Sequence, residues 1–404
     1  MTITTGTWLG ALENELQNNI LGFWMKHTLD EDHGGFVGEI DNQMKVIPGA
    51  EKSLVLNARI LWTFATAYRT YGSAEYLGMA ERAYRYLLEH FLDKEYGGLY
   101  WMVDASGAPS QSKKQVYGQA FAIYALAEFH HATGNEEALN HAVEVFRVLE
   151  KYSYDTQYKG YIEALSREWE VTDELSLSDK DMNEKKSMNT HLHVLEGYTG
   201  LYRVWKSEEL RVKLAELIDT MLVHIIDDQD QHFHLFMDEE WHVKSDVTSY
   251  GHDIEGSWLL VEAAEVLGDE ALLERVRKVA VTMAEAVLAE GIDKDGGIWN
   301  EAGKNGLLNE EKDWWPQAEA MVGFYNAYQL TQDTRFMDAS AAVWTFIDRY
   351  IVDHEHGEWY WAVDEHLQPL AHAPKVSAWK CPYHNGRACF EMIGRLQAAV
   401  KETH

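Results

Sequence analysis

Hydrophobic residues recur at three- and four-residue spacings through most of the chain, which is the pattern of helices that bury one face. The stretches "LVLNARILWTFATAYRTY" (54–71) and "AEYLGMAERAYRYLLEHFL" (74–92) show this spacing, and only a Gly-Ser pair separates them. Similar pairs follow along the sequence. We expect about twelve helices, beginning near residues 7, 52, 74, 115, 135, 186, 207, 251, 269, 314, 333 and 383.

Short stretches rich in glycine and aromatic residues recur between the helical pairs. They begin at His33, Tyr96, Tyr158, Gln231, Asp295 and His356. Equivalent markers, from Gly34 to Gly357, are separated by 63, 63, 72, 64 and 61 residues. A near-constant period of this length indicates a repeat architecture, and each stretch predicts a turn followed by a short strand.

The pairs and the period together predict an all-α fold, an (α/α)6 barrel of six helical hairpins with short β-hairpin connections. The first and last helices have no partner beside them in sequence, so we expect them to pack together and close the ring. One helix of each pair then lies inside and the other outside. No linker or low-complexity stretch interrupts the pattern, which predicts a single domain over residues 1–404.

Composition narrows the choice of partners. The chain has 15 Trp and 21 Tyr, which suit either large helix contacts or a site where flat rings pack on sugars. A net charge of −31 argues against nucleic-acid binding. No apolar run is long enough for a membrane span, and no signal peptide is visible at the start of the sequence. Cys381 and Cys389 indicate neither a disulfide framework nor a zinc site, so we expect a cytoplasmic enzyme.

Equivalent helix starts converge on one rim of such a barrel. The first turns of one helix in each pair carry Arg59, Tyr117, Asn189, His191, His193, His252, Glu255, Trp315, Glu319, His384 and Arg387. Asn189 and His193 are four residues apart, and His252 and Glu255 are three apart, so each pair shares a helix face. A single buried histidine is more often structural, but several at equivalent repeat positions favour one shared pocket.

Histidines near helix N-termini are disfavoured as imidazolium and can accept a proton near neutral pH. This pattern favours proton transfer over metal binding, because His191 and His193 are two residues apart and no zinc spacing is present. No nucleotide-binding glycine motif is found either. We therefore expect no metal and no cofactor.

Several of these segments resemble those of a known family. "KSMNTHLHVLEGYTGLY", "SYGHDIEGSWLLVEA", "KDWWPQAEAMVGFYNAY" and "WKCPYHNGRACFEMIGRL" are similar to the signature segments of cellobiose 2-epimerases, in the N-acylglucosamine 2-epimerase superfamily. The resemblance covers essentially the whole chain and implies an (α/α)6 barrel. Gly197 and Gly256 stand where alanine is expected, and we expect either to widen the pocket slightly.

The resemblance implies cofactor-independent epimerisation of the reducing-end glucose of β-1,4-linked disaccharides such as cellobiose, lactose and β-mannosyl-glucose. The matching catalytic residues are His193, His252 and His384, with Arg59 and Glu255 beside them. The matching substrate-binding residues are Tyr117, Asp181, Asn189, Glu301, Trp315 and Trp379. We expect a monomer or weak dimer.

Inversion at C2 requires ring opening, proton removal, rotation of an enediolate and return of the proton to the other face. We expect His252 and His384 to be the proton-transfer pair, His193 to assist ring opening, and Glu255 to orient His252. Arg59 would stabilise the developing negative oxygen, and Trp315 and Trp379 would stack on the sugar rings. Structural alternatives are an ion pair for Arg59 and core packing for the tryptophans.

Asp181 lies in the polar insertion "ELSLSDKDMNEKK" (174–186), which lengthens the third period. This insertion either covers the pocket mouth or is a solvated loop. Three other functions stay open: an aldose–ketose isomerase, an inverting glycoside hydrolase built on two carboxylates, and a non-catalytic sugar-binding protein.

Overall fold

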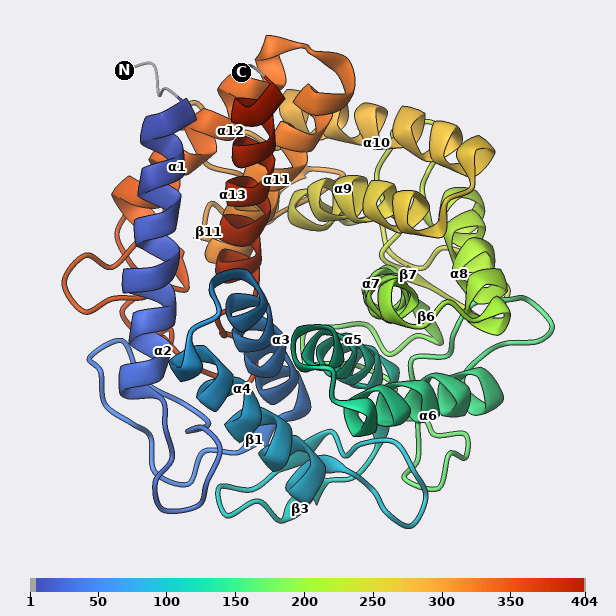
Figure 1. Ribbon diagram of the computed structural model, residues 1–404. Helices are drawn as coiled ribbons and strands as arrows, with labels where there is room; N and C mark the ends of the chain where they lie inside the picture. The colour runs from blue at the N-terminus through green and yellow to red at the C-terminus, as the bar shows by residue number, and fades with distance from the viewer. Residues whose placement is uncertain (1–4, 403–404) are drawn as a thin grey trace.

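The computed structural model describes residues 5–402, whose helices form two concentric rings (Figure 1). The inner helices are α3 (Leu54–Tyr71), α5 (Val116–Thr133), α7 (Met188–Val204), α9 (Tyr250–Leu267), α11 (Trp314–Thr331) and α13 (His384–Glu402). The outer helices are α1 (Thr5–Asn14), α4 (Ala74–Tyr86), α6 (Glu136–Tyr152), α8 (Glu208–Thr220), α10 (Glu270–Glu290) and α12 (Thr334–Phe346). The predicted all-α (α/α)6 barrel is confirmed, and each described helix begins within two residues of its predicted start.

Four outer helices contain a turn of π-helix that the sequence did not reveal. Helix α1 continues through η1 (Glu15–Leu21) into α2 (Gly22–His27), and α4, α8 and α12 end in η2 (Leu87–Phe91), η3 (Met221–Ile225) and η4 (Ile347–Ile351). Helix α1 packs directly on α13, so the first and last helices close the ring as predicted.

Burial separates the two rings. Inner helices such as α5 are apolar on nearly every side, and most of their residues are buried between both neighbours and the outer ring. Outer helix α6 instead buries one stripe, made by Ala138, Ala142, Val145 and Leu149, and leaves its acidic face to solvent. The apolar periodicity therefore decided which ring each helix joins.

Hydrogen-bonding side chains and glycines define where the inner helices begin and end. The Oγ atoms of Ser53 and Ser187 accept from the backbone N–H groups of Leu56 and Thr190, which caps α3 and α7. At the other end, Gly134 takes φ +73° and closes α5. These caps fix the register of the side chains in the first turns.

Short strands line the end of the barrel where the inner helices begin. They are β1 (Lys52–Ser53), β2 (Met102–Val103), β3 (Pro109–Gln111), β4 (Lys114–Gln115), β5 (Ala164–Leu165), β6 (Lys186–Ser187), β7 (Phe236–Met237), β8 (Thr248–Ser249), β9 (Glu301–Gly303), β10 (Gly306–Leu307), β11 (Lys312–Asp313) and β12 (Ala362–Val363). Pairs β2–β3 and β9–β10 are hairpins within one connection. Pairs β1–β2, β4–β5, β6–β7, β8–β9 and β11–β12 are antiparallel and join neighbouring connections.

A bridge between Ile40 and Val376 joins the first connection to the last, so the strand ring closes like the helix ring. Each predicted glycine and aromatic stretch contains a turn closed by such a bridge, as between Leu92 and Leu99.

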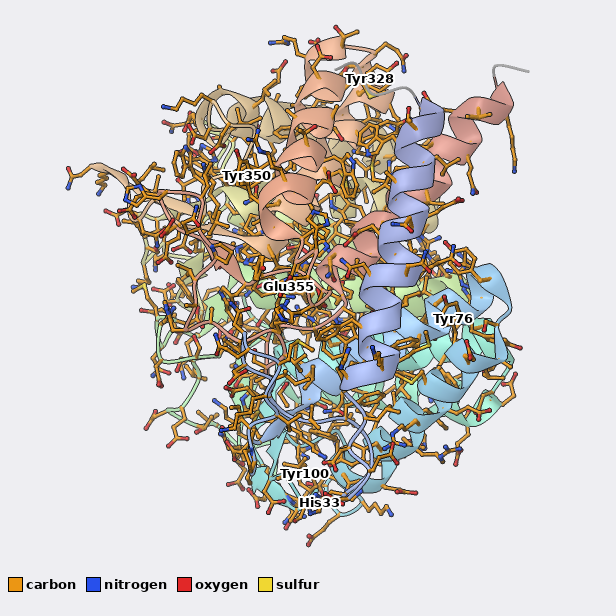
Figure 2. The ribbon with its side chains drawn as sticks, turned by 90° about the vertical axis from the view of Figure 1, so that its left-hand side faces the viewer. His33, Tyr76, Tyr100, Tyr328, Tyr350 and Glu355 are labelled. Atoms are coloured by element: carbon orange, nitrogen blue, oxygen red, sulfur yellow. The ribbon has the colours of Figure 1, made fainter. Side chains whose placement is uncertain are left out.

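The two ends of the barrel differ. Figure 2 shows Tyr76, beside a short turn within a hairpin, on one side of the molecule, and Tyr350, beside a long connection between hairpins, on the other. Long connections leave room for a cavity at the end where they lie. Among the described helices, none combines the length and apolarity that a membrane crossing needs.

Candidate active site

A cavity of about 530 Å³ opens where the inner helices begin. Its walls come from the first turns of these helices, the strands before them and the polar insertion. The lining residues are Arg59, Tyr117, Leu177, Ser178, Asp179, Lys180, Asp181, Asn189, His193, His252, Glu255, Asp313, Trp314, Trp315, Trp361, Trp379 and His384. Eight of the eleven side chains that we placed at this pocket from the helix starts line it, and His191, Glu319 and Arg387 do not.

Ten of the eleven catalytic and substrate-binding residues that the family resemblance implied line this cavity, and the exception is Glu301. Glu301 begins strand β9 and does not line the cavity. Burial and the nearby negative charge of Asp181 raise its pKa, so it lies next to the insertion without facing the cavity. Leu177 to Asp181 line the cavity, so the insertion contributes to its wall.

The three cavity histidines are held in the same way. His193 Nδ1 lies 2.8 Å from Glu196 Oε2, and His384 Nδ1 lies 2.6 Å from Glu319 Oε1. His252 Nδ1 lies 2.8 Å from the hydroxyl of Ser249. Each ring thus uses Nδ1 for the protein and makes no hydrogen bond to the described residues through Nε2. A ring anchored at Nδ1 presents Nε2 as its reactive nitrogen.

All three rings favour the neutral form. Burial lowers the pKa of His252 to about 3, helped by the nearby ring of His193. Burial also lowers the pKa of His193 and, together with the charges of Arg59 and Arg387, holds that of His384 well below its usual range. The sequence predicted neutral imidazoles from helix N-termini, but desolvation is the larger cause.

His191 is structural. Its Nδ1 bonds the Ser187 carbonyl at 2.7 Å, and its Nε2 accepts from the Tyr161 backbone N–H at 2.9 Å. With both nitrogens used and the ring absent from the cavity wall, this histidine anchors the preceding turn to α7.

Glu255 does not orient His252, and that prediction is wrong. Its Oε1 accepts from Arg387 Nη2 at 2.7 Å, whereas His252 is held by Ser249. Glu255 Oε2 has no hydrogen-bond partner, and the residue lines the cavity. Burial and the charge of Glu319 hold the pKa of Glu255 well above its usual range. Burial thus favours the uncharged form of Glu255, which could donate from Oε2 to a ligand oxygen in the cavity.

Arg387 ties the carboxylates behind the cavity together. It donates to Glu196, Glu255 and Glu319, and its neighbour Tyr383 also donates to Glu196. Burial alone would raise the pKa of Glu196, but Arg387 and the bonds from His193 and Tyr383 lower it to about 2. One guanidinium thus fixes the partners of both His193 and His384.

Glu255, Glu319 and His384 offer ligand atoms within 4.8 Å of one another, which is the spacing of a metal site. Arg387 Nη2 already donates to both carboxylates, at 2.7 and 2.6 Å. A cation bound there would have to compete with this guanidinium, so we assign no metal to the cluster.

Arg59 is not held by a carboxylate in the described part of the chain. Its Nη2 donates to the Tyr117 hydroxyl at 2.8 Å, Nη1 lies 3.9 Å from Cys381 Sγ, and the guanidinium stacks 4.3 Å from the Phe121 ring centre. Its Nε has no partner. The positive charge is therefore unpaired and faces the cavity.

Aromatic rings shape the cavity around these groups. Trp315 packs against two histidines, with its ring centre 4.5 Å from that of His252 and 5.6 Å from that of His384. Trp379 contacts Tyr117 at 5.8 Å. Both indoles are partly exposed to the cavity, and Asn189 Oδ1 beside them has no partner. Flat rings with free polar atoms between them suit a sugar.

Sequence reasoning missed several residues of the site. Glu196 follows His193 by three residues, the spacing that we used for His252 and Glu255, so the signal was present. Asp313 and Trp361 also line the cavity. Burial raises the pKa of Asp313 to about 7. Asp313 precedes α11 and Trp361 lies in the next connection, outside the helix starts on which the prediction rested.

Gly197 and Gly256 do not widen the pocket, contrary to our expectation. A Cβ at Gly197 would lie 2.7 Å from the Ala120 carbonyl oxygen, and one at Gly256 would lie 2.2 Å from the Phe233 ring. Both glycines allow close packing inside the wall, away from the cavity.

Neutral imidazoles, a free guanidinium and indole rings around one cavity define an enzyme that moves protons on a carbohydrate. The model of the N-acylglucosamine 2-epimerase (GlcNAc 2-epimerase) family matches residues 34–388. The chain is 46% identical to a cellobiose 2-epimerase of Bacteroides fragilis over 95% of this chain and 98% of that one. It is 37% identical to a cellobiose 2-epimerase of Dictyoglomus turgidum, over 94% and 97% of the two chains.

The structure of a cellobiose 2-epimerase from Bacillus thermoamylovorans superimposes with a TM-score of 0.92 at 40% identity, covering 96% of this chain and all of that one. This protein belongs to the N-acylglucosamine 2-epimerase family.

Proposed function

We propose that the protein epimerises C2 of the reducing-end glucose of β-1,4-linked disaccharides, converting cellobiose to glucosylmannose and lactose to epilactose without a cofactor. It is a carbohydrate epimerase, an enzyme of the isomerase class. The observation that carries the proposal is the set of three neutral histidines, each free at Nε2, around one cavity. Full-length similarity to cellobiose 2-epimerases supports this substrate class.

The proton steps need a base on each face of C2. The C2 hydrogen becomes acidic only when the ring has opened to the aldehyde, and the proton must return to the opposite face. His252 and His384 come from helices α9 and α13, and both rings contact Trp315 at the same cavity. We assign these two histidines to the two faces, with Nε2 as the atom that takes or returns the proton.

His193 is assigned to ring opening and closure. Its ring belongs to α7 and packs 4.9 Å from Tyr117, whereas His252 and His384 both pack on Trp315. Glu196 holds its Nδ1, so Nε2 is directed toward the ring oxygen or O1 of the sugar. This role needs a neutral imidazole that can both accept and donate a proton, as burial provides.

Arg59 is assigned to the oxygen that becomes negative when the C2 proton leaves. A fixed donor of this kind costs no reorganisation during the reaction, because Tyr117 and Phe121 already hold it. Glu255, uncharged and free at Oε2, donates to a neighbouring hydroxyl of the open chain. Together these groups hold the enediolate while its C2–C3 bond rotates.

The outer part of the cavity suits the second sugar. We assign the second sugar to Trp379, Trp361 and the insertion residue Asp181, which line the same cavity, and a volume of about 530 Å³ is within the usual range for sites that take a ligand of disaccharide size. Trp315 and Trp379 are assigned to ring stacking, and Glu301 to a supporting position behind Asp181.

The geometry disfavours an inverting hydrolase. The ligand oxygens of Glu255 and Glu319 lie within 4.8 Å of each other, whereas the two carboxyl groups of an inverting hydrolase stand about 6.5–9.5 Å apart. Both carboxylates are also bonded to Arg387. An aldose–ketose isomerase remains the second candidate, because it would pass through the same enediolate.

Incubation with cellobiose or lactose in D2O, followed by NMR, tests the proposal. We expect deuterium at C2 of both the substrate and the mannose-type epimer. Release of glucose without the epimer would establish a hydrolase, and a ketose as the main product would establish the isomerase. Unchanged exchange in His252→Ala or His384→Ala would remove that histidine from the proton steps.

A further inference from the structure

Five of the six repeats fix their turn with the same buried ion pair. In these repeats a lysine reaches back to an aspartate at the start of the turn; it stands two residues before α3, α5, α7 and α11 and nine residues before α13. The pairs are Lys52–Asp30, Lys114–Asp93, Lys186–Asp155, Lys312–Asp293 and Lys375–Asp353. The fourth repeat has Thr248 in the lysine position, at the start of β8. The turn before α9 must therefore be fixed in another way.

His232 provides the substitute. Where His232 stands, the second and third repeats have Gly98 and Gly160, whose side-chain space is filled by Trp169 and Trp241. His232 Nδ1 instead lies 2.7 Å from Asp253 Oδ2, and Asp253 Oδ1 accepts from the Phe233 backbone N–H at 2.8 Å.

The fourth residue of the inner helix also bonds the turn in the second, third and fifth repeats, through the uncharged side chains of Gln119, His191 and Gln317. Gln119 of α5 bonds both backbone groups of Leu99, and Gln317 of α11 bonds both of Ile298. Asp253 is the fourth residue of α9, so an acid paired with His232 replaces the glutamine in this repeat.

Helix α9 begins without a side-chain cap, as α5 and α11 also do. Ser53 and Ser187 use their hydroxyls to cap α3 and α7, but Ser249 makes no cap because its hydroxyl bonds His252 Nδ1. The hydroxyl of Ser249 thus holds the His252 ring and does not cap the first turn of α9. Asp253 is the next residue along, and its bonds to the turn tie that same part of the helix down.

We propose that the His232–Asp253 pair positions His252 by holding the first turn of α9, where the other five repeats have a lysine–aspartate pair and where α3 and α7 also have a serine cap. The proposal rests on the proton-transfer role of His252 proposed above. His232 and Asp253 do not line the cavity, so they act through the backbone of the first turn of α9.

The charges around His232 make this anchor sensitive to pH. Besides Asp253, its ring faces Glu290 of α10, with Nε2 3.3 Å from Oε2, and Asp230 of its own turn, while the Tyr250 ring packs at 6.0 Å. Burial alone would lower the pKa of His232, but Asp253 and the other acids raise it to about 9. The raised pKa makes the stabilisation fully present below the unfolded-state pKa of about 6.5 and lost as pH rises through about 9.

The test compares His232→Gly with the double variant His232→Gly/Asp253→Gln, which copies the Gly98–Gln119 arrangement of the second repeat. We expect His232→Gly to lower kcat about tenfold with little change in KM, because it leaves the first turn of α9 loosely held. The double variant should recover most of kcat and lose the fall in kcat near pH 9. Lys114→Met removes the Lys114–Asp93 ion pair of the second repeat. It should lower thermal stability but leave the fall in kcat near pH 9 unchanged.

A readout independent of turnover is the ¹⁵N NMR signal of the His252 ring. We expect it to shift in His232→Gly and to return in the double variant. Wild-type His252 signals and an unchanged alkaline profile in His232→Gly would overturn the proposal. Full activity in His252→Ala would instead overturn the proposed proton-transfer role of His252. The NMR signal of its ring would still show whether the His232–Asp253 pair positions it.

Discussion

Nδ1 of His384 lies 2.6 Å from Oε1 of Glu319, a buried carboxylate on the neighbouring inner helix. The same oxygen accepts from Arg387 at 2.6 Å, and Trp258 donates to the other oxygen at 3.0 Å. Hydrogen bonds to both oxygens, from two residues of α13 and from Trp258 of α9, hold this carboxylate in place and so orient the imidazole of His384. A fixed carboxylate also favours the tautomer with the proton on Nδ1 and the lone pair on Nε2.

Glu319→Gln should therefore lower kcat about 10- to 100-fold with a small change in KM. The amide has nearly the same shape but supports the Nδ1–H tautomer of His384 less strongly. Steady-state kinetics and C2 deuterium exchange measure the effect. Trp258→Phe, which removes only the bond to the other oxygen, is the matched control and should cost less. Equal activity in Glu319→Gln and wild type would contradict this role.

Glu255 should tolerate the same change. Burial holds its pKa well above the usual range and so favours its uncharged form, which an amide resembles: the amide can still accept from Arg387 and donate to the sugar. We expect Glu255→Gln to lose less than about tenfold in kcat/KM, and Glu255→Ala to lose about 100-fold by leaving Arg387 under-satisfied. A larger loss in Glu255→Gln than in Glu255→Ala would show that the residue works as a carboxylate.

Arg59 should contribute mainly to the transition state. Removing it in Arg59→Ala takes away the donor for the developing negative oxygen, and we expect kcat to fall about 100- to 1,000-fold. Tyr117→Phe keeps the charge but removes the 2.8 Å bond that fixes it, so its loss should be smaller. Rates of C2 exchange measure both variants. If Arg59→Ala raised only KM, the residue would bind the ground state alone.

Buried neutral histidines should make the fold sensitive to acid. Burial lowers the pKa of His191 to about 4 in the folded protein, whereas the histidine of the unfolded chain has a pKa of about 6.5. Between these pH values the unfolded chain therefore binds a proton that the folded chain does not bind. By linkage, this residue alone should reduce the free energy of unfolding by about 2 kcal/mol between pH 7 and pH 5. Urea unfolding at the two pH values measures the change. His191→Gln, which copies Gln119 and Gln317, should show a correspondingly smaller pH dependence.

Hydrophobic periodicity was enough to predict the barrel, because every repeat supplies one helix to the buried inner ring and one to the half-exposed outer ring. The convergence of Arg59, His193, His252 and His384 followed from that repeat and from the family resemblance. Hydrogen-bond partners could not be predicted in the same way. Spacing along α9 suggested a bond between His252 and Glu255, but Arg387 from α13 captures Glu255 instead. Such contacts join residues 132 apart in sequence and depend on the packed geometry.

Single-repeat exceptions were equally hidden. His232 served only as a repeat marker in the sequence, and its pairing with Asp253 becomes visible once the five lysine pairs are seen together. Oligomeric state, the exact domain limits and the cytoplasmic location stay predictions.

The contact of α1 with α13 and the Ile40–Val376 bridge have a consequence for chain connectivity. Since the circle is completed by packing, with no covalent link across that seam, the place where the polypeptide starts is arbitrary with respect to the architecture. A circularly permuted gene that joins α13 to α1 through a short flexible linker, and opens the surface turn at Gly134–Asn135, should yield the same enzyme. The fold is in effect a closed ring of six hairpins with a single break in the polypeptide chain.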